Sequence, residues 1–101
     1  VPGFNSNAVI GKIHYYGGNG VPQNYALAAE SLKEAGNDSE ALYLLGKLYL
    51  EGKGLKQDDG RAFSAFRQAS ELGDMEAKAE LGKMYCLGRG TARDYALAVQ
   101  Y

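Results

Sequence analysis

Hydrophobic residues recur at helical spacing along most of the chain. One stripe consists of Ala41, Leu45, Leu48 and Tyr49. After a short segment with glycines, a second stripe consists of Ala62, Phe66 and Ala69. Intervals of three and four residues place such side chains on one side of an α-helix, and polar residues fill the positions between them. The pattern therefore predicts two amphipathic helices joined by a turn.

The same two-helix pattern returns at a nearly fixed interval. The phrase LGKLYLEGKG begins at Leu45, and LGKMYCLGRG begins at Leu81, 36 positions later. We place three repeats at about residues 4–37, 38–74 and 75–101, the last of which stops within its second helix. Self-similarity at such a period indicates a solenoid, in which each unit buries its apolar side against the next. The expected fold is an all-α solenoid of two-helix repeats.

Polar residues and glycines mark the expected helix ends. Asn24, Asp58 and Asp94 precede the second helices, where they are expected to act as N-caps. The adjoining Asp59 is interpreted in the same way. The glycine-containing segments 17–20, 52–54 and 88–90 are expected to end the first helices. Segment 17–20 follows a helix and lacks the G-K-[ST] ending of a phosphate loop, so we interpret it as a turn.

A glycine also stands in the middle of each expected first helix, at Gly11, Gly46 and Gly82. Glycine in a helix interior costs about 1 kcal/mol relative to alanine. Its return in every repeat predicts that a neighbouring helix approaches closely there, where a Cβ would collide.

Composition and charge exclude several classes of function. The chain has 11 basic and 12 acidic residues, with a net charge of −1. This balance argues against nucleic-acid binding, and no apolar run approaches the roughly 20 residues of a membrane span. We therefore expect no nucleic-acid partner and no membrane insertion. The start VPGFNSN has neither an initiator Met nor a signal-peptide pattern, so we expect either a processed form or a part of a longer protein.

Neither His14 nor Cys86 is expected to carry chemistry. His14 is the only histidine and stands where the other repeats have tyrosine, so it is expected to be packed or half-exposed. No ligand set accompanies it, and no metal or other cofactor is expected. Cys86 stands where the preceding repeat has Leu50, which favours a small apolar residue over a reactive thiol. A single cysteine forms no internal disulfide, and the compartment stays open.

These residues resemble the Sel-one-like repeat family, a relative of the tetratricopeptide repeats. The family phrase is A-x-x-x-L-G-x-x-Y-x-x-G-x-G-V-x-x-D-Y, followed by A-x-x-x-[WY]-x-x-A-A and a closing Gly. The second repeat matches at Ala41, Leu45, Gly46, Tyr49, Gly52, Gly54, Asp58, Ala62, Phe66, Ala69 and Gly73. The third repeat matches at Ala77, Leu81, Gly82, Tyr85, Gly88, Gly90, Asp94, Tyr95 and Ala98. The first repeat departs at Ile10, His14 and Asn24.

The resemblance implies a right-handed superhelix with a concave groove lined by the first helices. It also implies an adaptor or scaffold that binds a protein or peptide, and not an enzyme. The alternative is a hydrolase on the repeat scaffold, as proposed for cysteine-rich relatives, although those carry paired cysteines and this chain has one. Because the last repeat is cut and has no polar cap, we expect either a longer array or self-association through the open ends.

A second stripe on the first helices supplies candidate contacts for a partner. The candidates are Lys12, Tyr15, Glu40, Tyr43, Lys47, Leu50, Glu76, Lys83 and Cys86. A lysine recurs in all three repeats, so stacking in register would form a basic ladder beside apolar residues. Such a ladder favours a peptide or helix with acidic and apolar groups. Alternatively, lysine recurs because it is a good exposed helix former, and Glu40 and Glu76 partly neutralise it.

Overall fold

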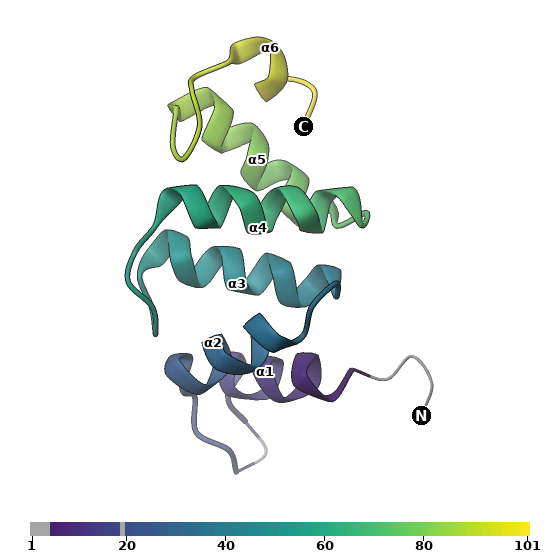
Figure 1. Ribbon diagram of the computed structural model, residues 1–101, viewed down its shortest axis with the longest axis vertical. Helices are drawn as coiled ribbons and strands as arrows, with labels where there is room; N and C mark the ends of the chain where they lie inside the picture. Colours follow the sequence, from purple (N-terminus) through teal and green to yellow (C-terminus); the bar gives the residue numbers. More distant parts are fainter. Residues whose placement is uncertain (1–4, 19) are drawn as a thin grey trace.

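The structure is a computed structural model that describes residues 5–18 and 20–101 (Figure 1). Within these residues the helices are α1 (Ser6–Tyr16), α2 (Tyr25–Glu34), α3 (Ser39–Glu51), α4 (Asp59–Glu71), α5 (Met75–Leu87) and α6 (Tyr95–Ala98). Figure 1 shows them stacked along the long axis from the N-terminus to the C-terminus, and each helix packs against the next in sequence. The predicted all-α solenoid of two-helix units is confirmed.

Each of these helices begins after an Asn or Asp side chain that caps it. The side-chain oxygens of Asn24, Asp58 and Asp94 accept hydrogen bonds of 3.1, 3.0 and 3.0 Å from backbone N–H groups three residues later. These caps satisfy donors that have no partner within the helix, as predicted. The same cap occurs at the first helices, where it was not predicted, at Asn5, Asp38 and Asp74.

The expectation for Asp59 was wrong. This residue is the first of α4 and does not cap it, because Asp58 holds that position. The carboxylate of Asp59 instead accepts hydrogen bonds from the guanidinium of Arg89, with Nη2 to Oδ1 at 2.8 Å and Nε to Oδ2 at 3.3 Å. Asp59 therefore links the second repeat to the joint that follows α5.

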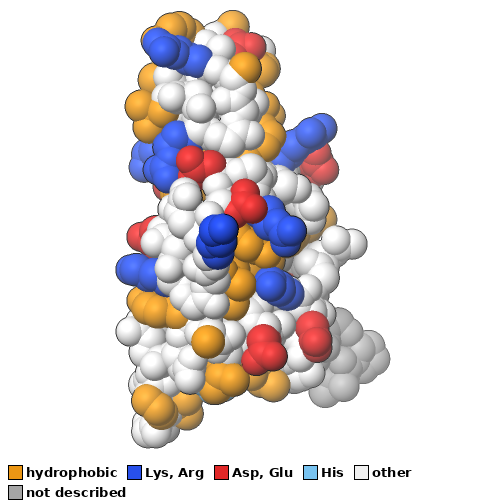
Figure 2. Space-filling view, turned by 60° about the vertical axis from the view of Figure 1, so that its left-hand side comes forward, with side chains coloured by type: hydrophobic (Ala, Val, Ile, Leu, Met, Phe, Trp, Pro, Cys, Tyr) orange, Lys and Arg blue, Asp and Glu red, His pale blue; other side chains and the backbone are white. Residues whose placement is uncertain are grey.

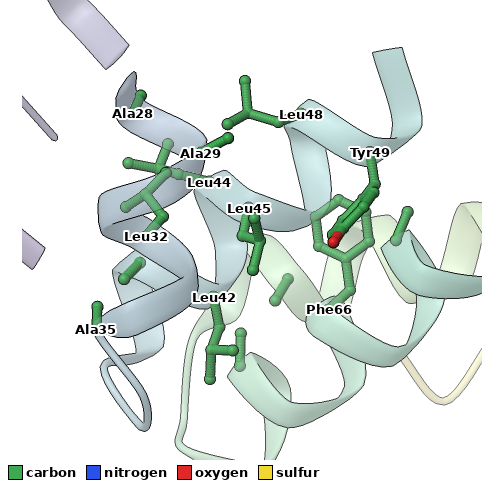
Figure 3. Close-up of a cluster of buried hydrophobic side chains, with 14 of the residues drawn as sticks. Ala28, Ala29, Leu32, Ala35, Leu42, Leu44, Leu45, Leu48, Tyr49 and Phe66 are labelled. Carbon is green, nitrogen blue, oxygen red and sulfur yellow. The ribbon is translucent and has the colours of Figure 1, made fainter. Parts of the chain in front are cut away.

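The core lies between successive helices and contains the predicted stripes. Leu44 and Leu48 of α3 are buried, and Figure 3 shows them beside Ala28 and Ala29 of α2. On another side of α3, Phe66 of α4 is completely buried. Helix α3 is thus enclosed by the second helices of two repeats, which explains why a single helical pair cannot bury its own apolar surface.

The mid-helix glycines lie where the two helices of one repeat meet. A Cβ placed on Gly46 would lie 2.7 Å from Cε1 of Phe66, and one placed on Gly11 would lie 2.6 Å from Cδ2 of Leu32. At Gly82 the nearest atom is the carbonyl oxygen of Ala98, at 3.1 Å. The predicted close approach is confirmed at Gly11 and Gly46, and the glycine makes room for a large side chain of the second helix.

The two glycines of each joint after α3 and α5 have different tasks. Gly52 and Gly88 end these helices in the left-handed conformation, with φ of 68° and 70°. Gly54 and Gly90 also have positive φ, at 72° and 70°. In addition, a Cβ on Gly54 would overlap the backbone carbonyl of Tyr25 in the preceding repeat, and one on Gly90 would overlap that of Asp59. The second glycine of each joint therefore sets the contact between repeats.

The residue between these two glycines contacts the same place in the preceding repeat. Nζ of Lys53 lies 5.4 Å from the centre of the Tyr25 ring, a cation–π distance. In the next joint, Arg89 pairs with Asp59, the counterpart of Tyr25. The cation is kept while its partner changes from an aromatic ring to a carboxylate.

Candidate functional site

A hollow of about 510 Å³ opens on the surface formed by the first helices, and we call it the first-helix hollow. Its lining comes from α1, from the start of α3, and from the turn that leads into α5. The lining residues are Tyr16, Ser39, Glu40, Tyr43, Gly73, Asp74, Met75 and Glu76. The hollow therefore spans all three repeats and exists only because they stack.

The helix starts position the polar side chains of the first-helix hollow. Glu40 and Glu76 lie in the first turns of α3 and α5, where the partial positive charge of the helix end favours a carboxylate. Asp74 is the N-cap of α5 and accepts a hydrogen bond of 2.9 Å from the backbone N–H of Ala77. One carboxylate oxygen of Asp74 is therefore already used in capping the helix. Glu76 is not paired with any cation among the residues described.

Exposed apolar surface adjoins these carboxylates. The side chain of Tyr16 is 61% exposed and that of Met75 is 72% exposed. Tyr43 is half-buried and packs against Phe66, with ring centres 5.8 Å apart. Aromatic and methionine side chains that are exposed in a hollow provide contact area for a partner.

The three lysines of the predicted ladder each have a partner within the chain. Nζ of Lys12 lies 3.1 Å from Oε2 of Glu40, so Glu40 pairs with the lysine of the preceding repeat and not with Lys47 of its own helix. Lys83 pairs with Glu80 at 3.5 Å and not with Glu76. Nζ of Lys47 lies 5.9 Å from the centre of the Tyr43 ring. These contacts reduce the basic character of the surface, although exposed pairs of this kind contribute little to stability.

The pKa values of three tyrosines on α1 and α3 are raised above the usual value. Burial, followed by the charge of Glu76, raises the pKa of Tyr43 to about 12. Burial, followed by the charge of Glu51, raises the pKa of Tyr15 to about 12. Burial and then Glu40 also raise the pKa of Tyr16. Burial is the larger cause for all three tyrosines, and nearby carboxylates add to it.

We expect the free energy of unfolding to fall as the pH rises from 10 towards 12. The pKa values of Tyr15 and Tyr43 rise from 10.0 to about 12 on folding, so the unfolded chain releases these protons first. The stabilisation is complete below the unfolded pKa and is lost as the pH rises through the folded one. Urea unfolding on both sides of pH 10 measures the fall. The Tyr15→Phe/Tyr43→Phe variant should show a smaller fall, and an equal fall would contradict the assignment.

The structure brings together only part of the predicted contact set. Glu40, Tyr43 and Glu76 line the first-helix hollow. Lys12 is not in the lining but forms an ion pair with Glu40. The others lie outside its lining, namely Tyr15, Lys47, Leu50, Lys83 and Cys86. The ring of Tyr15 packs edge-on against Tyr16 at 4.9 Å, Leu50 is half-buried against the core, and Cys86 is an exposed free thiol.

Met75, Asp74 and Ser39 belong to the hollow but were not predicted as contacts. Ser39 and Met75 are the first residues of α3 and α5, and Asp74 is the N-cap of α5, so all three lie outside the helical stripe from which the contacts were predicted. Met75 carries the signal that could have identified it, because it is a large apolar residue directly after a cap.

His14 is half-exposed, as expected from its tyrosine counterparts. Its Nδ1 lies 2.9 Å from the carbonyl oxygen of Ile10, and its own carbonyl accepts the N–H of Asn24 at 2.8 Å. Tyr49 and Tyr85 accept the same backbone bond from Asp58 and Asp94.

Among residues 5–18 and 20–101, no group of three or more potential ligands could hold a metal ion. None of the helices described there is long and apolar enough to cross a bilayer.

Comparison with known proteins gives a consistent result. The family model of the Sel1 repeat matches residues 6–35, 39–74 and 76–101. The crystal structure of c5321, a protective antigen of uropathogenic Escherichia coli strains with an SLR fold, is 35% identical with a TM-score of 0.88. A Sel1 repeat protein from Oxalobacter formigenes is 27% identical with a TM-score of 0.86. Each match covers 94% of this chain, but only 21% and 40% of those two chains. No curated protein matches the chain.

Proposed function

The chain belongs to the Sel1 repeat family, and from this premise we propose that it binds a segment of a partner protein in the first-helix hollow. Proteins of this family are generally protein-interaction scaffolds and are typically not enzymes. The proposed mechanism is passive, because a stack of rigid helical pairs presents a fixed surface to the partner. The concave face implied by the family resemblance is the side on which we place the contact.

The observation that carries this proposal is the composition of the hollow. It combines the exposed side chains of Tyr16 and Met75 with the half-buried ring of Tyr43, and it extends over three repeats. Large aromatic side chains dominate the energy of many protein interfaces. The stability of the fold alone does not explain why Tyr16 and Met75 are exposed in this hollow.

The charges of the hollow favour a segment that carries Lys or Arg. Glu40, Asp74 and Glu76 line it, and the lining contains no basic residue. Glu40 already forms an ion pair with Lys12, whereas Glu76 can pair with a Lys or Arg of the partner. Complementary charges of this kind contribute more to selectivity and association rate than to affinity. This differs from the acidic partner favoured by the lysine ladder, because the three lysines are engaged within the chain.

An affinity capture with a matched control tests the proposal. The Tyr16→Ser/Met75→Ser variant should bind a captured partner about tenfold more weakly, since two exposed anchors are lost. The control is Leu87→Ser/Tyr95→Ser, because these side chains are 66% and 60% exposed but lie outside the hollow. A partner that is retained equally by both variants would contradict the proposed surface.

Cys86 lies on α5 and His14 on α1, in different repeats, so these two residues give no support to the hydrolase alternative. Self-association through the ends of the stack stays a proposal. It is supported by Val9 and Ile13, which are 36% and 40% exposed although their counterparts Leu44 and Leu48 are buried.

A further inference from the structure

A second groove lies on a different side of α3, between α2 and α4, and we call it the α2–α4 trough. One part is a hollow of about 350 Å³ lined by Lys33, Tyr49, Leu55, Lys56, Gln57, Asp58 and Arg61. The other part is a hollow of about 250 Å³ lined by Leu42, Leu45, Tyr49, Arg61, Ser64, Ala65 and Gln68. The two parts share Tyr49 and Arg61, so they meet at these residues. Successive residues of an α-helix are 100° apart around its axis, so Leu42, Leu45 and Tyr49 lie on a different side of α3 from Tyr43. Tyr43 lines the first-helix hollow.

The trough has an apolar floor and basic edges. Leu42, Leu45 and Tyr49 are 7%, 8% and 8% exposed, so each shows only a small part of its side chain. Figure 2 shows Lys and Arg side chains around hydrophobic surface near the middle of the molecule. Lys33 comes from α2, Lys56 from the joint before α4, and both are exposed.

These cations have little internal compensation. The single acid of the lining, Asp58, accepts the N–H of Arg61 at 3.0 Å and pairs with Nε of Arg61 at 3.4 Å. Within residues 5–18 and 20–101, neither Lys33 nor Lys56 makes an ion pair. The guanidinium of Arg61 lies 6.0 Å from the centre of the Tyr49 ring, where the two parts of the trough meet. The trough therefore keeps an excess of positive charge at its opening.

The repeat scaffold does not require this charge. Arg61 has Leu27 and Leu97 as counterparts in the other repeats, and Lys56 has Pro22 and Ala92. The helices and joints form at all of these positions regardless of charge. Arg61 and Lys56 are thus particular to this trough, whereas Lys33 has a basic counterpart in the second repeat, Arg67.

We propose that the α2–α4 trough binds an acidic segment of a protein partner. A carboxylate of the segment would lie between Lys33 and Lys56, and a neighbouring aliphatic side chain would contact Leu42 and Leu45. The apolar floor and the two joined parts of the trough favour a peptide with several side chains over a lone phosphate group, which needs no apolar contact. This surface is separate from the first-helix hollow, so each can be tested without the other.

Fluorescence anisotropy with a labelled peptide of sequence Leu-Glu-Glu-Leu-Glu tests the proposal. The wild-type chain should bind it, and the matching peptide with Gln in place of Glu should bind at least about tenfold more weakly. The Lys33→Glu/Lys56→Glu variant should also lose about tenfold in affinity, because like charges then face each other. Both residues are exposed, so circular dichroism should show an unchanged fold.

The control is the Arg67→Glu/Lys83→Glu variant, which changes the net charge equally at exposed positions outside the trough. It should bind the acidic peptide as the wild type does. An equal loss in both variants would show that only bulk charge matters and would overturn the proposal. No binding by the wild type would overturn it too, as would a phosphoserine peptide that binds tighter and is displaced by inorganic phosphate.

Discussion

Replacing Gly54 by alanine is expected to lower the free energy of unfolding by about 3 kcal/mol or more, because two penalties combine. The first is the positive φ of 72°, which residues with a side chain rarely adopt. The second is overlap of the new Cβ with the carbonyl group of Tyr25. The neighbouring backbone belongs to the preceding repeat, so relief of the overlap requires the repeats to separate. Urea unfolding monitored by circular dichroism measures the change.

Gly73→Ala provides the matched control for Gly54→Ala. Gly73 also has a positive φ, of 97°, but a Cβ there would have no atom within 4 Å. Its substitution should therefore cost only the conformational penalty, about 1–2 kcal/mol. The difference between the two variants reports the contact between repeats. Equal losses would show that Gly54 acts only as a turn residue.

Phe66→Ala is expected to cost about 3–5 kcal/mol, the usual range for a buried phenylalanine. Phe66 is completely buried and fills the space that Gly46 leaves open on α3. A domain of this size is commonly stable by only about 5–15 kcal/mol, so the variant should lose a large share of its stability and unfold at a lower temperature. Thermal and urea unfolding measure the loss.

A double-mutant cycle separates the specific contact from general loss of core. Gly46→Ala alone should destabilise the chain, although alanine favours helix, because its Cβ would lie 2.7 Å from the Phe66 ring. In the Phe66→Ala background the same change should be neutral or stabilising. Additive effects of the two changes would mean that Gly46 and Phe66 are not coupled.

The sequence predicted the repeat unit because its signals are local. Helical stripes, caps and joint glycines depend on neighbours within a few residues, and the structure confirms them at Phe66, Asp58 and Gly52. The role of Gly54 was not predicted. Its reason is a contact with Tyr25, and which atoms meet across two repeats depends on how the helices pack in three dimensions.

The candidate site was predictable only in part for the same reason. Glu40, Tyr43 and Glu76 follow from one helical stripe, but Met75 is the first residue of α5 and lies outside that stripe. The lysine ladder assumed that equivalent residues have equivalent surroundings. The structure instead gives Lys12 a glutamate of the next repeat and gives Lys47 the ring of Tyr43 on its own helix. Stacking, and not the repeat pattern, decides those partners.

The most direct test of the central claim is to map the bound surface at residue level. A partner segment obtained by affinity capture would be added to the ¹⁵N-labelled chain, and amide chemical shifts would be followed by NMR. We expect the largest shifts around the first-helix hollow, at Tyr16, Glu40, Tyr43, Met75 and Glu76. Shifts confined to residues outside this hollow would contradict the claim that it is the binding surface.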